Sequence, residues 1–474
     1  MSSELSRTEL SCLITHKKGF AFKSKDYIPS GVPVVRVSNF TWDSISTDDL
    51  RYVSHEVASS TKVVQLNEYD VIVATVGSWP QNPDSIVGKV VRVPCPLSGA
   101  LLNQNTVRLR VNDDNLVNQK YLYIALKTKE FSDHLISKAQ GSANQASITL
   151  SDIFSYAIPW GTYTQRKYIV NVIDSINDKI VIANQINQTL EQMAQALFKS
   201  WFVDFEPVKA KMAVLEAGGS QEDATLAAMA AISGKDTDAL VVFEREHPEH
   251  YAELKATAEL FPSAMQEGEL GATPTGWKLG CIGDISHRIR TKVGSTSAVV
   301  LSAIASGDLV PSDEHFTKQV YSKSIEKYIL VEQWSFAYNP SRINIGSIGL
   351  NVRNVNGAVS PVYVVFKTEQ EYKWYVEILT KTTYFKNNVN ILASGSVRQS
   401  LSYDDLSSIP LCIPDVSIVN VFNEKYEVYL TFIEQYRNQN NTLISIRDTL
   451  LPKLLSGEIT LPEAEQAVSE AENV

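Results

Sequence analysis

The chain contains an internal repeat, and this repeat restricts its fold more than any other feature of the sequence. The segment Gly141-Ser142-Ala143-Asn144-Gln145 recurs as Gly395-Ser396-Val397-Arg398-Gln399, 254 residues later. Each copy is followed by a short apolar segment, an Ile-Pro pair and a long helical pattern. Such self-similarity predicts two copies of one structural unit within a single polypeptide.

Each copy ends in a helix whose apolar residues follow a heptad spacing. The first seam steps alternately by four and three residues from Ile169 to Trp201, with a polar break at Asn187. A shift of 253 residues gives a second seam from Phe422 to Leu454, with its asparagine at Asn440. This spacing predicts two helices that pair through these faces. We expect the two asparagines to be buried near the middle of the pair and to set its register.

The segments before the helices are rich in β-branched residues, and glycine, asparagine and serine separate them. The sequence therefore predicts an α+β fold, in which two mixed α/β domains are joined by two long antiparallel coiled-coil helices in a pseudo-two-fold repeat. We expect a first α/β domain in 1–160, a central helix in 161–202, an acidic and mostly helical spacer in 203–275, a second α/β domain in 276–416, a distal helix in 417–457 and an acidic tail in 458–474.

The charge of the chain is unevenly distributed. The net charge is −10, yet residues 203–275 alone contain 14 acidic and 5 basic residues, and the tail has five glutamates and no basic residue. The rest of the chain is therefore mildly basic. This distribution leaves nucleic-acid binding open for the two α/β domains, although it is weak support by itself.

The four cysteines stand alone, so neither a zinc finger nor a disulfide framework is expected. No apolar run reaches the ~20 residues that a membrane span needs, and the N-terminus lacks the pattern of a signal peptide. These features predict a soluble cytoplasmic protein with reduced thiols.

Motifs of catalysis are missing from the sequence. It contains no G-x-G-x-x-G, G-x-x-x-x-G-K-[ST], H-E-x-x-H or G-x-S-x-G pattern. His247 and His250 lie in the acidic spacer, where a solvated surface is a better interpretation than a metal site. The loop that begins at Asn339 is superficially similar to the Asn-Pro-Pro-Tyr loop of amino-methyltransferases, but it lacks the second proline and the aromatic residue. We therefore expect no catalytic residue, metal site or cofactor in this chain.

Several polar loops carry residue types that suit DNA. Arginine, asparagine and glutamine can form bidentate hydrogen bonds with base edges, while lysine, serine and backbone amides hold phosphates. Each loop alone could be an ordinary turn, but their duplication favours binding. The candidate DNA-binding residues are Lys18, Phe20, Lys23, Lys25, Asn103, Gln104, Asn105, Ser142, Asn144, Gln145, Asn339, Ser341, Arg342, Asn344, Ser396, Arg398 and Gln399.

Four stretches carry a resemblance to a known family: Lys18 to Tyr27, Ala196 to Pro207, Tyr338 to Gly349 and Leu451 to Ile459. On these residues the chain resembles the DNA-specificity subunit of a type I restriction-modification enzyme. The resemblance covers nearly the whole chain and agrees with the repeat.

The resemblance implies that each α/β domain is a target-recognition domain for one half of a split sequence in double-stranded DNA. It also implies that the paired helices space the two domains and that two methylation subunits bind the helices. S-adenosylmethionine would belong to these methylation subunits, and ATP and magnesium to restriction subunits. The alternative is a non-catalytic coiled-coil adaptor that binds protein or glycan, and a band shift on duplex DNA would separate the two hypotheses.

Overall fold

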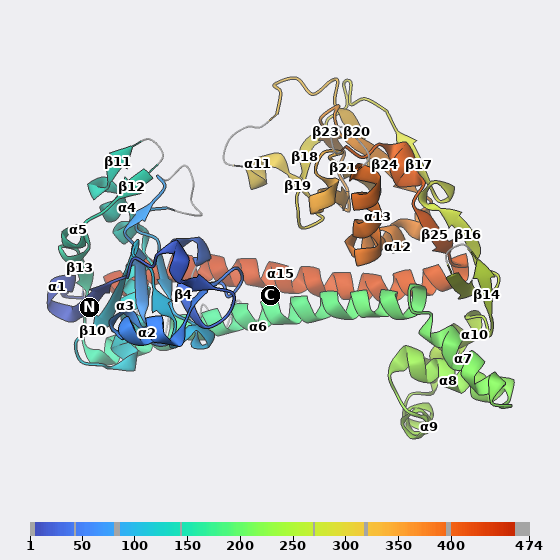
Figure 1. Ribbon diagram of the computed structural model, residues 1–474, viewed down its shortest axis with the longest axis horizontal. Coiled ribbons are helices and arrows are strands. Elements are labelled where there is room, and N and C mark those ends of the chain that lie inside the picture. Colours follow the sequence, from blue (N-terminus) through green and yellow to red (C-terminus); the bar gives the residue numbers. More distant parts are fainter. Residues whose placement is uncertain are drawn as a thin grey trace. The chain divides into compact units, whose positions relative to one another are not determined.

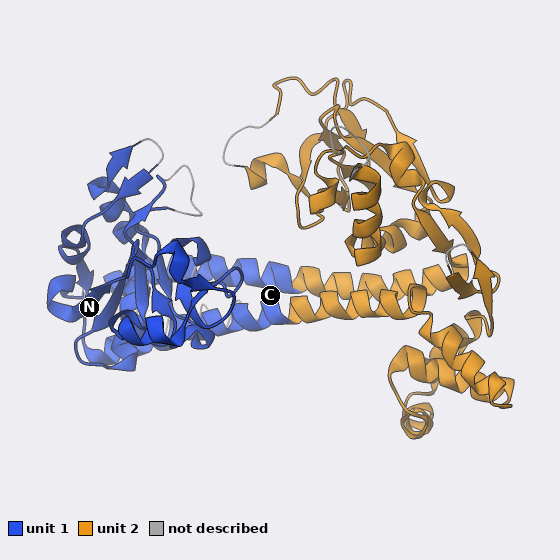
Figure 2. Ribbon diagram, in the orientation of Figure 1, with its two compact units in different colours: residues 1–185, 436–474 blue, residues 186–435 orange. Residues whose placement is uncertain are grey.

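The computed structural model describes residues 5–41, 44–79, 86–142, 145–268, 271–316, 321–394 and 400–459. The chain forms two compact units (Figure 2). Unit 1 comprises residues 1–185 and 436–474, and unit 2 comprises residues 186–435. Each unit contains one α/β domain and a part of both long helices, α6 and α15 in Figure 1.

Two small sheets form the α/β domain of unit 1. The first is antiparallel, in the order β2 (Ile14–Lys18), β10 (Thr106–Val111), β6 (Val71–Ala74), β8 (Val90–Arg92). The second has the order β3 (Tyr27–Ile28), β5 (Arg51–Val53), β4 (Val32–Val35), β9 (Leu101–Leu102), in which β4 and β9 are parallel. All four side chains of β6 are buried. Val71 and Val73 enter one apolar cluster, and Ile72 and Ala74 enter another, because successive side chains of a strand point to opposite faces.

Helices and a closing strand pair complete this domain. β1 (Arg7–Glu9) pairs with β13 (Ala157–Pro159), so that the two ends of the domain lie next to each other. The covering helices are α1 (Leu10–Leu13), α2 (His55–Ser60), α3 (Leu116–Leu126), α4 (Lys129–Lys138) and α5 (Leu150–Phe154).

The α/β domain of unit 2 repeats this plan. Its antiparallel sheet has the order β17 (Ser286–Ile289), β24 (Val364–Thr368), β21 (Ser335–Tyr338), β22 (Ile348–Leu350). Its second sheet has the order β19 (Leu309–Pro311), β18 (Val299–Ala303), β23 (Gly357–Val359), β20 (Ile329–Val331), again with one parallel pair, β18 and β23. The domain is completed by α11 (Ser312–His315), α12 (Lys373–Lys381), α13 (Thr383–Ser394), α14 (Tyr403–Ser407) and the closing pair β16 (Lys278–Cys281) with β25 (Pro410–Ile413).

The ends of the two domains show how closely the halves match. Thr149 and Asp152 form a capping box at α5, and Ser402 and Asp405 form the same box at α14, 253 residues later. The same shift of 253 residues relates Tyr156 to Ile409, just before the closing strands. These two residues occupy equivalent places, because Tyr156 O accepts from Leu10 N and Ile409 O accepts from Ile282 N. The two Ile-Pro pairs are therefore not equivalent: Ile158 corresponds to Leu411 and not to Ile413. The internal repeat is confirmed, with this correction.

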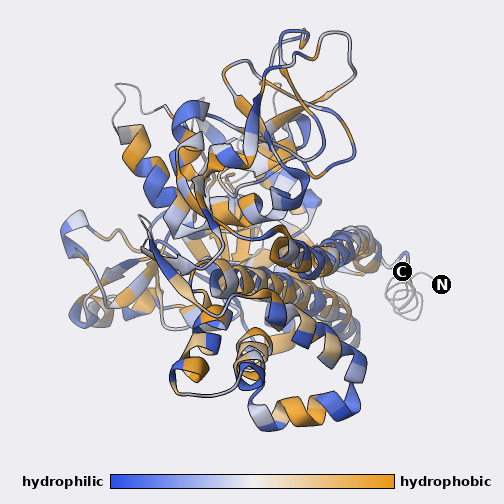
Figure 3. Ribbon diagram, turned by 90° about the vertical axis from the view of Figure 1, so that its right-hand side faces the viewer, coloured by the Kyte–Doolittle hydropathy of each residue, from blue (hydrophilic) through white to orange (hydrophobic). Residues whose placement is uncertain are grey.

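The long helices are α6 (Tyr163–Phe202) and α15 (Val416–Ser456). In unit 1, Ile169 near the start of α6 shares an apolar cluster with Leu454 near the end of α15. In unit 2, Phe198 near the end of α6 packs against Phe422 near the start of α15, with ring centroids 5.9 Å apart. The helices are therefore antiparallel in each unit. The predicted seam positions are all buried or half-buried, and polar and apolar residues alternate along the helices (Figure 3).

The polar positions of the seam differ in detail from the expectation. Asn187 and Asn440 are both buried, but the amide of Asn440 donates to Asn184 Oδ1 (2.7 Å), one turn before Asn187. A second polar layer lies in unit 1, where Arg447 Nη1 donates to Asn177 Oδ1 (3.2 Å). In unit 2, the positions related by 253 residues to this layer are apolar: Ala194 belongs to the main core, and Leu430 is partly buried and packs against it.

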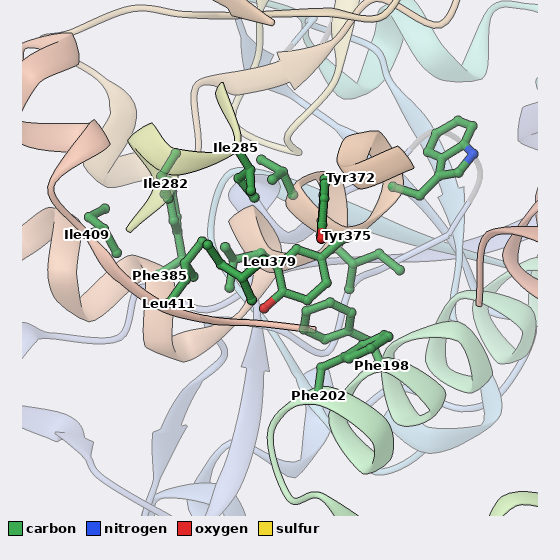
Figure 4. Close-up of a cluster of buried hydrophobic side chains, with 14 of the residues drawn as sticks. Phe198, Phe202, Ile282, Ile285, Tyr372, Tyr375, Leu379, Phe385, Ile409 and Leu411 are labelled. Carbon is green, nitrogen blue, oxygen red and sulfur yellow. The ribbon is translucent and has the colours of Figure 1, made fainter. Parts of the chain in front are cut away.

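The main core of unit 2 joins the second domain to α6 (Figure 4). The rings of Phe198 and Phe202 lie against Tyr375 of α12, with centroids 5.3 and 5.2 Å apart. Ile282 and Leu411, from the two ends of the domain, belong to the same cluster. Burial of this much aromatic surface fixes α12 on the long helix.

Residues 206–260 form four helices with a small core of their own. The helices are α7 (Glu206–Glu216), α8 (Gln221–Ser233), α9 (Thr237–Glu246) and α10 (Pro248–Leu260). Ala228, Met229, Leu240, Leu254 and Ala258 form the core. A hairpin of β14 (Met265–Gly268) and β15 (Gly271–Pro274) then leads to the second domain. Among the described residues, no helix has the length and apolar character needed to cross a membrane.

Candidate nucleic-acid interface

Three loops of the first α/β domain leave its antiparallel sheet at the same end. Lys18 ends β2 and pairs with Val107, the second residue of β10. Ala74 ends β6 and pairs with Thr106, the first residue of β10. Because the neighbouring strands are antiparallel, the loops that follow β2 and β6 and the loop that precedes β10 emerge together.

Backbone hydrogen bonds hold these loops side by side. Phe20 N donates to Leu102 O (2.9 Å), and Thr75 N donates to Asn105 O (2.9 Å). The contacts are close because residue 19 is a glycine: a Cβ there would stand 1.9 Å from the carbonyl oxygen of Asn103. The structure thus brings together five of the predicted residues: Lys18, Phe20, Asn103, Gln104 and Asn105.

The loop from Lys18 to Tyr27 presents cations and an aromatic ring to solvent. Lys23 N donates to the carboxylate of Asp26 (2.9 Å), which orders the loop while the Lys23 and Lys25 side chains stay exposed. The ring of Phe20 is 43% exposed. Ammonium groups suit phosphates, and an exposed ring can stack on a base or sugar.

The duplicated loop of the first half lies in a β-hairpin beside these residues. β11 (Gln140–Ser142) and β12 (Gln145–Ser147) pair with each other, and β12 pairs with β7 (Val76–Gly77), which follows β6. Gly141 has a φ of 157°, and a Cβ there would stand 2.0 Å from the carbonyl oxygen of Gln145, so the close backbone approach requires glycine. The Ser142 and Gln145 side chains are exposed, and Asn144 lies outside the described residues.

Sequence reasoning missed the residue that supports this hairpin. The indole nitrogen of Trp79 donates to the carbonyl oxygen of Ser142 (2.7 Å). Ile148, just after the hairpin, donates its amide to Thr75 O (3.0 Å), which ties the hairpin to the same end of the sheet. A tryptophan one residue before a proline gave no periodic signal for this contact.

In the second domain, the loop after β21 holds the predicted residues. Asn339 Oδ1 accepts from Ser341 N (3.1 Å), and Asn339 O accepts from Arg342 N (2.9 Å). Asn339 is half-buried and shapes the turn, whereas the side chains of Ser341, Arg342 and Asn344 are exposed. The exposed guanidinium and amide are the groups of this loop that can reach a base or phosphate.

The second copy of the duplicated loop contains Ser396, Arg398 and Gln399, which lie outside the described residues. The chain that follows them is anchored at the Asn339 loop: Leu401 N donates to Pro340 O (3.2 Å), and Leu401 O accepts from the hydroxyl of Tyr338 (3.2 Å). Burial raises the pKa of Tyr338, so its hydroxyl remains a donor at any physiological pH.

The matching strand orders reveal two further candidates. β17 takes the place of β2, so the residues after Ile289 correspond to those after Lys18. Arg290 and Lys292 lie in this loop with exposed side chains. Basic residues directly after a strand were the available signal, but it becomes visible only when the strands of the two halves are aligned.

No group of three or more potential metal-ligating side chains occurs within the described parts of the chain. The rings of His247 and His250 are 6.1 Å apart, between the centroids, and both residues are exposed at the junction of α9 and α10.

Comparison with known proteins shows which family the sequence resembles. A sequence model of the family described as the type I restriction modification DNA specificity domain matches residues 8–192. The specificity subunit of the type I restriction enzyme HindI from Haemophilus influenzae is 32% identical over 73% of this chain and 78% of the relative. The MjaIX specificity subunit from Methanocaldococcus jannaschii is 22% identical over 74% and 71% of the two chains.

Solved structures of similar proteins cover nearly the whole chain. A type I S subunit from M. genitalium aligns over 95% of this chain and 96% of its own, with 14% identity and a TM-score of 0.46. The HsdS subunit from Thermoanaerobacter tengcongensis aligns over 96% and 97%, with 11% identity and a TM-score of 0.30.

The matched domain is described as a DNA specificity domain, which makes this chain a protein that recognises DNA sequence. The chain belongs to the specificity subunits of type I restriction enzymes.

Proposed function

We propose that each α/β domain is a target-recognition domain that reads one half of a two-part DNA sequence. The observation that carries this proposal is the duplicated antiparallel sheet, β2-β10-β6-β8 and β17-β24-β21-β22, in a chain of this family. Because the strand order is the same, loops at equivalent places can meet two separate half-sites in the same way. The two domains comprise residues 1–160 and 276–416.

The loops at the described end of each sheet make the DNA contacts in this proposal. Exposed lysines and arginines hold phosphates, and amides and arginines read base edges. Asn144 and Arg398 differ at the same place in the duplicated loop, so they contribute to what each half reads. Arg290 and Lys292 join the predicted residues as phosphate contacts of the second half.

The chain acts as a non-catalytic subunit in the cytoplasm. Its relatives are named as specificity subunits of restriction enzymes, which supports an assembly with two methylation subunits and with restriction subunits. S-adenosylmethionine, ATP and magnesium then bind to those partners. The long helices α6 and α15 are the elements that the methylation subunits contact in this proposal.

Exchange of one domain tests the proposal. β16 and β25 pair with each other, so residues 276–416 begin and end at one place and can be replaced as a block. The block is exchanged for the matching domain of a relative, and the assembled methyltransferase is then used to methylate genomic DNA. We expect sequencing of the methylated sites to show one half of the motif changed and the other half retained. A change in both halves, or a continuous motif in the wild type, would contradict two-part reading.

A further inference from the structure

Three side chains in contact with one another connect the first recognition domain to the long helix α6. The ammonium of Lys120, on α3, lies 4.7 Å from the centroid of the Tyr69 ring. The same ammonium forms an ion pair of 2.8 Å with Asp174 on α6. The aromatic ring lies just before β6, so the link runs from the start of this strand, through α3, to the helix.

The second half contains the same link, made from different residues. Lys373, on α12, lies 4.7 Å from the centroid of the Trp334 ring and forms an ion pair of 3.4 Å with Glu427 on α15. Lys373 and Glu427 each stand 253 residues after their counterparts, Lys120 and Asp174. The same three kinds of group, an aromatic ring, a lysine and a carboxylate, thus form the link in both halves, which indicates a shared task.

The backbone adopts an unusual conformation to place each ring. Tyr69 has a φ of 65° and Trp334 a φ of 63°, a region that residues with a Cβ rarely occupy. Hydrogen bonds hold both residues there: Tyr69 N donates to Val93 O (2.9 Å), and Trp334 N donates to Asn351 O (2.8 Å). A strained position that recurs in both halves is expected where geometry matters for function.

Each carboxylate also receives a second donor, and the donors differ. Arg92 Nη1 lies 3.6 Å from Asp174, and the indole nitrogen of Trp374 donates to Glu427 Oε1 (2.7 Å). The side chains of Lys120 and Lys373 are only 22% and 13% exposed. The Asp174 side chain is 19% exposed, so solvent screens the first ion pair weakly, whereas the Glu427 side chain is 52% exposed and is held by its second donor, Trp374.

We propose that the two links are orientation clamps, which fix the angle of each recognition domain on its own helix segment. The inference rests on the proposed two-part reading. β6 and β21 run from the clamp to the loops at Thr75 and Asn339, where the candidate DNA contacts begin. A domain held at one angle accepts its half-site at one place along the duplex, so the clamps restrict the number of base pairs allowed between the half-sites. Lys120 and Lys373 are positioning residues in this scheme.

The test replaces Lys373 with methionine in the complex with the methylation subunits. Methionine keeps the apolar stem over Trp334 but removes the charge. The DNA probes carry both half-sites, as found in DNA methylated by the wild type, at the natural spacing and with one base pair more or fewer. We expect discrimination between the spacings to fall about tenfold, while the sequence of each half-site is unchanged. Lys373→Arg, which keeps the charge and can stack on the indole, should restore discrimination.

A matched control separates orientation from stability. Leu301 is buried in β18, in a cluster that contains no residue of the long helices. Leu301→Ala should lower Tm of the complex without broadening the accepted spacing. The clamp proposal is overturned if Lys373→Met lowers Tm of the complex but leaves the range of accepted half-site spacings narrow. It is also overturned if Lys373→Met and Leu301→Ala broaden this range equally. A wild type that reads one continuous site would overturn the proposed two-part reading together with the spacing role.

Discussion

At the scale of single residues, Gly19 holds together two of the loops that we propose as DNA contacts. A Cβ at this position would stand 1.9 Å from the carbonyl oxygen of Asn103, and backbone cannot yield as a flexible side chain does. We expect Gly19→Ala to displace the loops and to weaken DNA binding by the assembled complex about tenfold or more, since such overpacking costs about 1–3 kcal/mol. Titration of a duplex containing the target measures this loss.

A second glycine provides the control for Gly19. Gly234 has a φ of 68° with open space around it, and it lies between α8 and α9. Gly234→Ala should lower the stability of the chain by about 1 kcal/mol through backbone strain and leave DNA affinity unchanged. If Gly19→Ala bound DNA as tightly as the wild type, the close contact between the loops at Gly19 and Asn103 would not be needed for DNA binding.

We expect Lys211 to make the stability of the four-helix segment depend on pH. Its side chain is buried, and its ammonium donates to the carbonyl oxygen of Phe261 (2.6 Å), just after α10. Burial lowers the pKa of Lys211 below the ordinary value of 10.5, although Glu259 opposes the shift. Between the lowered pKa and 10.5 the unfolded chain binds more protons than the folded chain, so stability rises with pH in this window.

Urea unfolding of the helical signal at a series of alkaline pH values measures this dependence. Lys211→Met should flatten the rise, because the variant has no proton to lose at this site. Lys209 is exposed on the same helix, and Lys209→Met should keep the rise of the wild type. If both variants behaved alike, another group would cause the pH dependence.

At the scale of secondary-structure elements, the asparagines reduce the stability of the helix pair. Asn440 is 6% exposed, and its Oδ1 has no hydrogen-bond partner among the described residues. Asn440→Leu removes this unpaired oxygen and leaves the exposed Asn184 to bind water, so we expect the free energy of unfolding to rise by about 1 kcal/mol. Thermal unfolding measures the change. Asn441→Leu, at an exposed neighbouring position, should have little effect, and a lower Tm for Asn440→Leu would indicate that leucine does not fit the seam.

Periodicity decided which elements could be predicted from the sequence. The seams of α6 and α15 were predictable because a buried stripe must recur every three or four residues over ten turns. The order of the strands was not, because strands of two to six residues carry little pattern and the pairing of β4 with β9 joins residues far apart in the chain. The core of the four-helix segment was missed because alanine, which supplies Ala228 and Ala258, gives weak apolar contrast.

The same limit applies to the candidate site. The clustering of Lys18, Phe20 and Asn103 follows from the register of β2 and β10, which the sequence could not supply. Arg290 and Lys292 became candidates only when β17 was found in the place of β2. The side chain of Asn339 turned out to shape its own loop, because an asparagine at the start of a turn often accepts a backbone amide two residues on.

At the scale of the whole molecule, each of the two repeated α/β domains is closed by a pair of strands at its own ends, and not by the segment that links the two halves. β1 with β13, and β16 with β25, bring the ends of each domain together before the chain enters a long helix. We therefore expect that either α/β domain can be exchanged without altering the helix that follows it. This arrangement is consistent with the proposal that the two domains read their half-sites independently.

The polar layer of Asn177 and Arg447 makes the two halves of the helix pair chemically different. Two second-half helices brought together would set Arg447 against Leu430, and the half-buried guanidinium would lose its amide partner. Two first-half helices would set Asn177 against Ala194, with no donor for the amide oxygen. Of these pairings, only a first half beside a second half lets the Arg447 guanidinium donate to the Asn177 amide oxygen. We therefore expect separately produced halves to pair with each other in preference to pairing with a second copy of themselves, so this one polar layer favours a heterodimer over either homodimer.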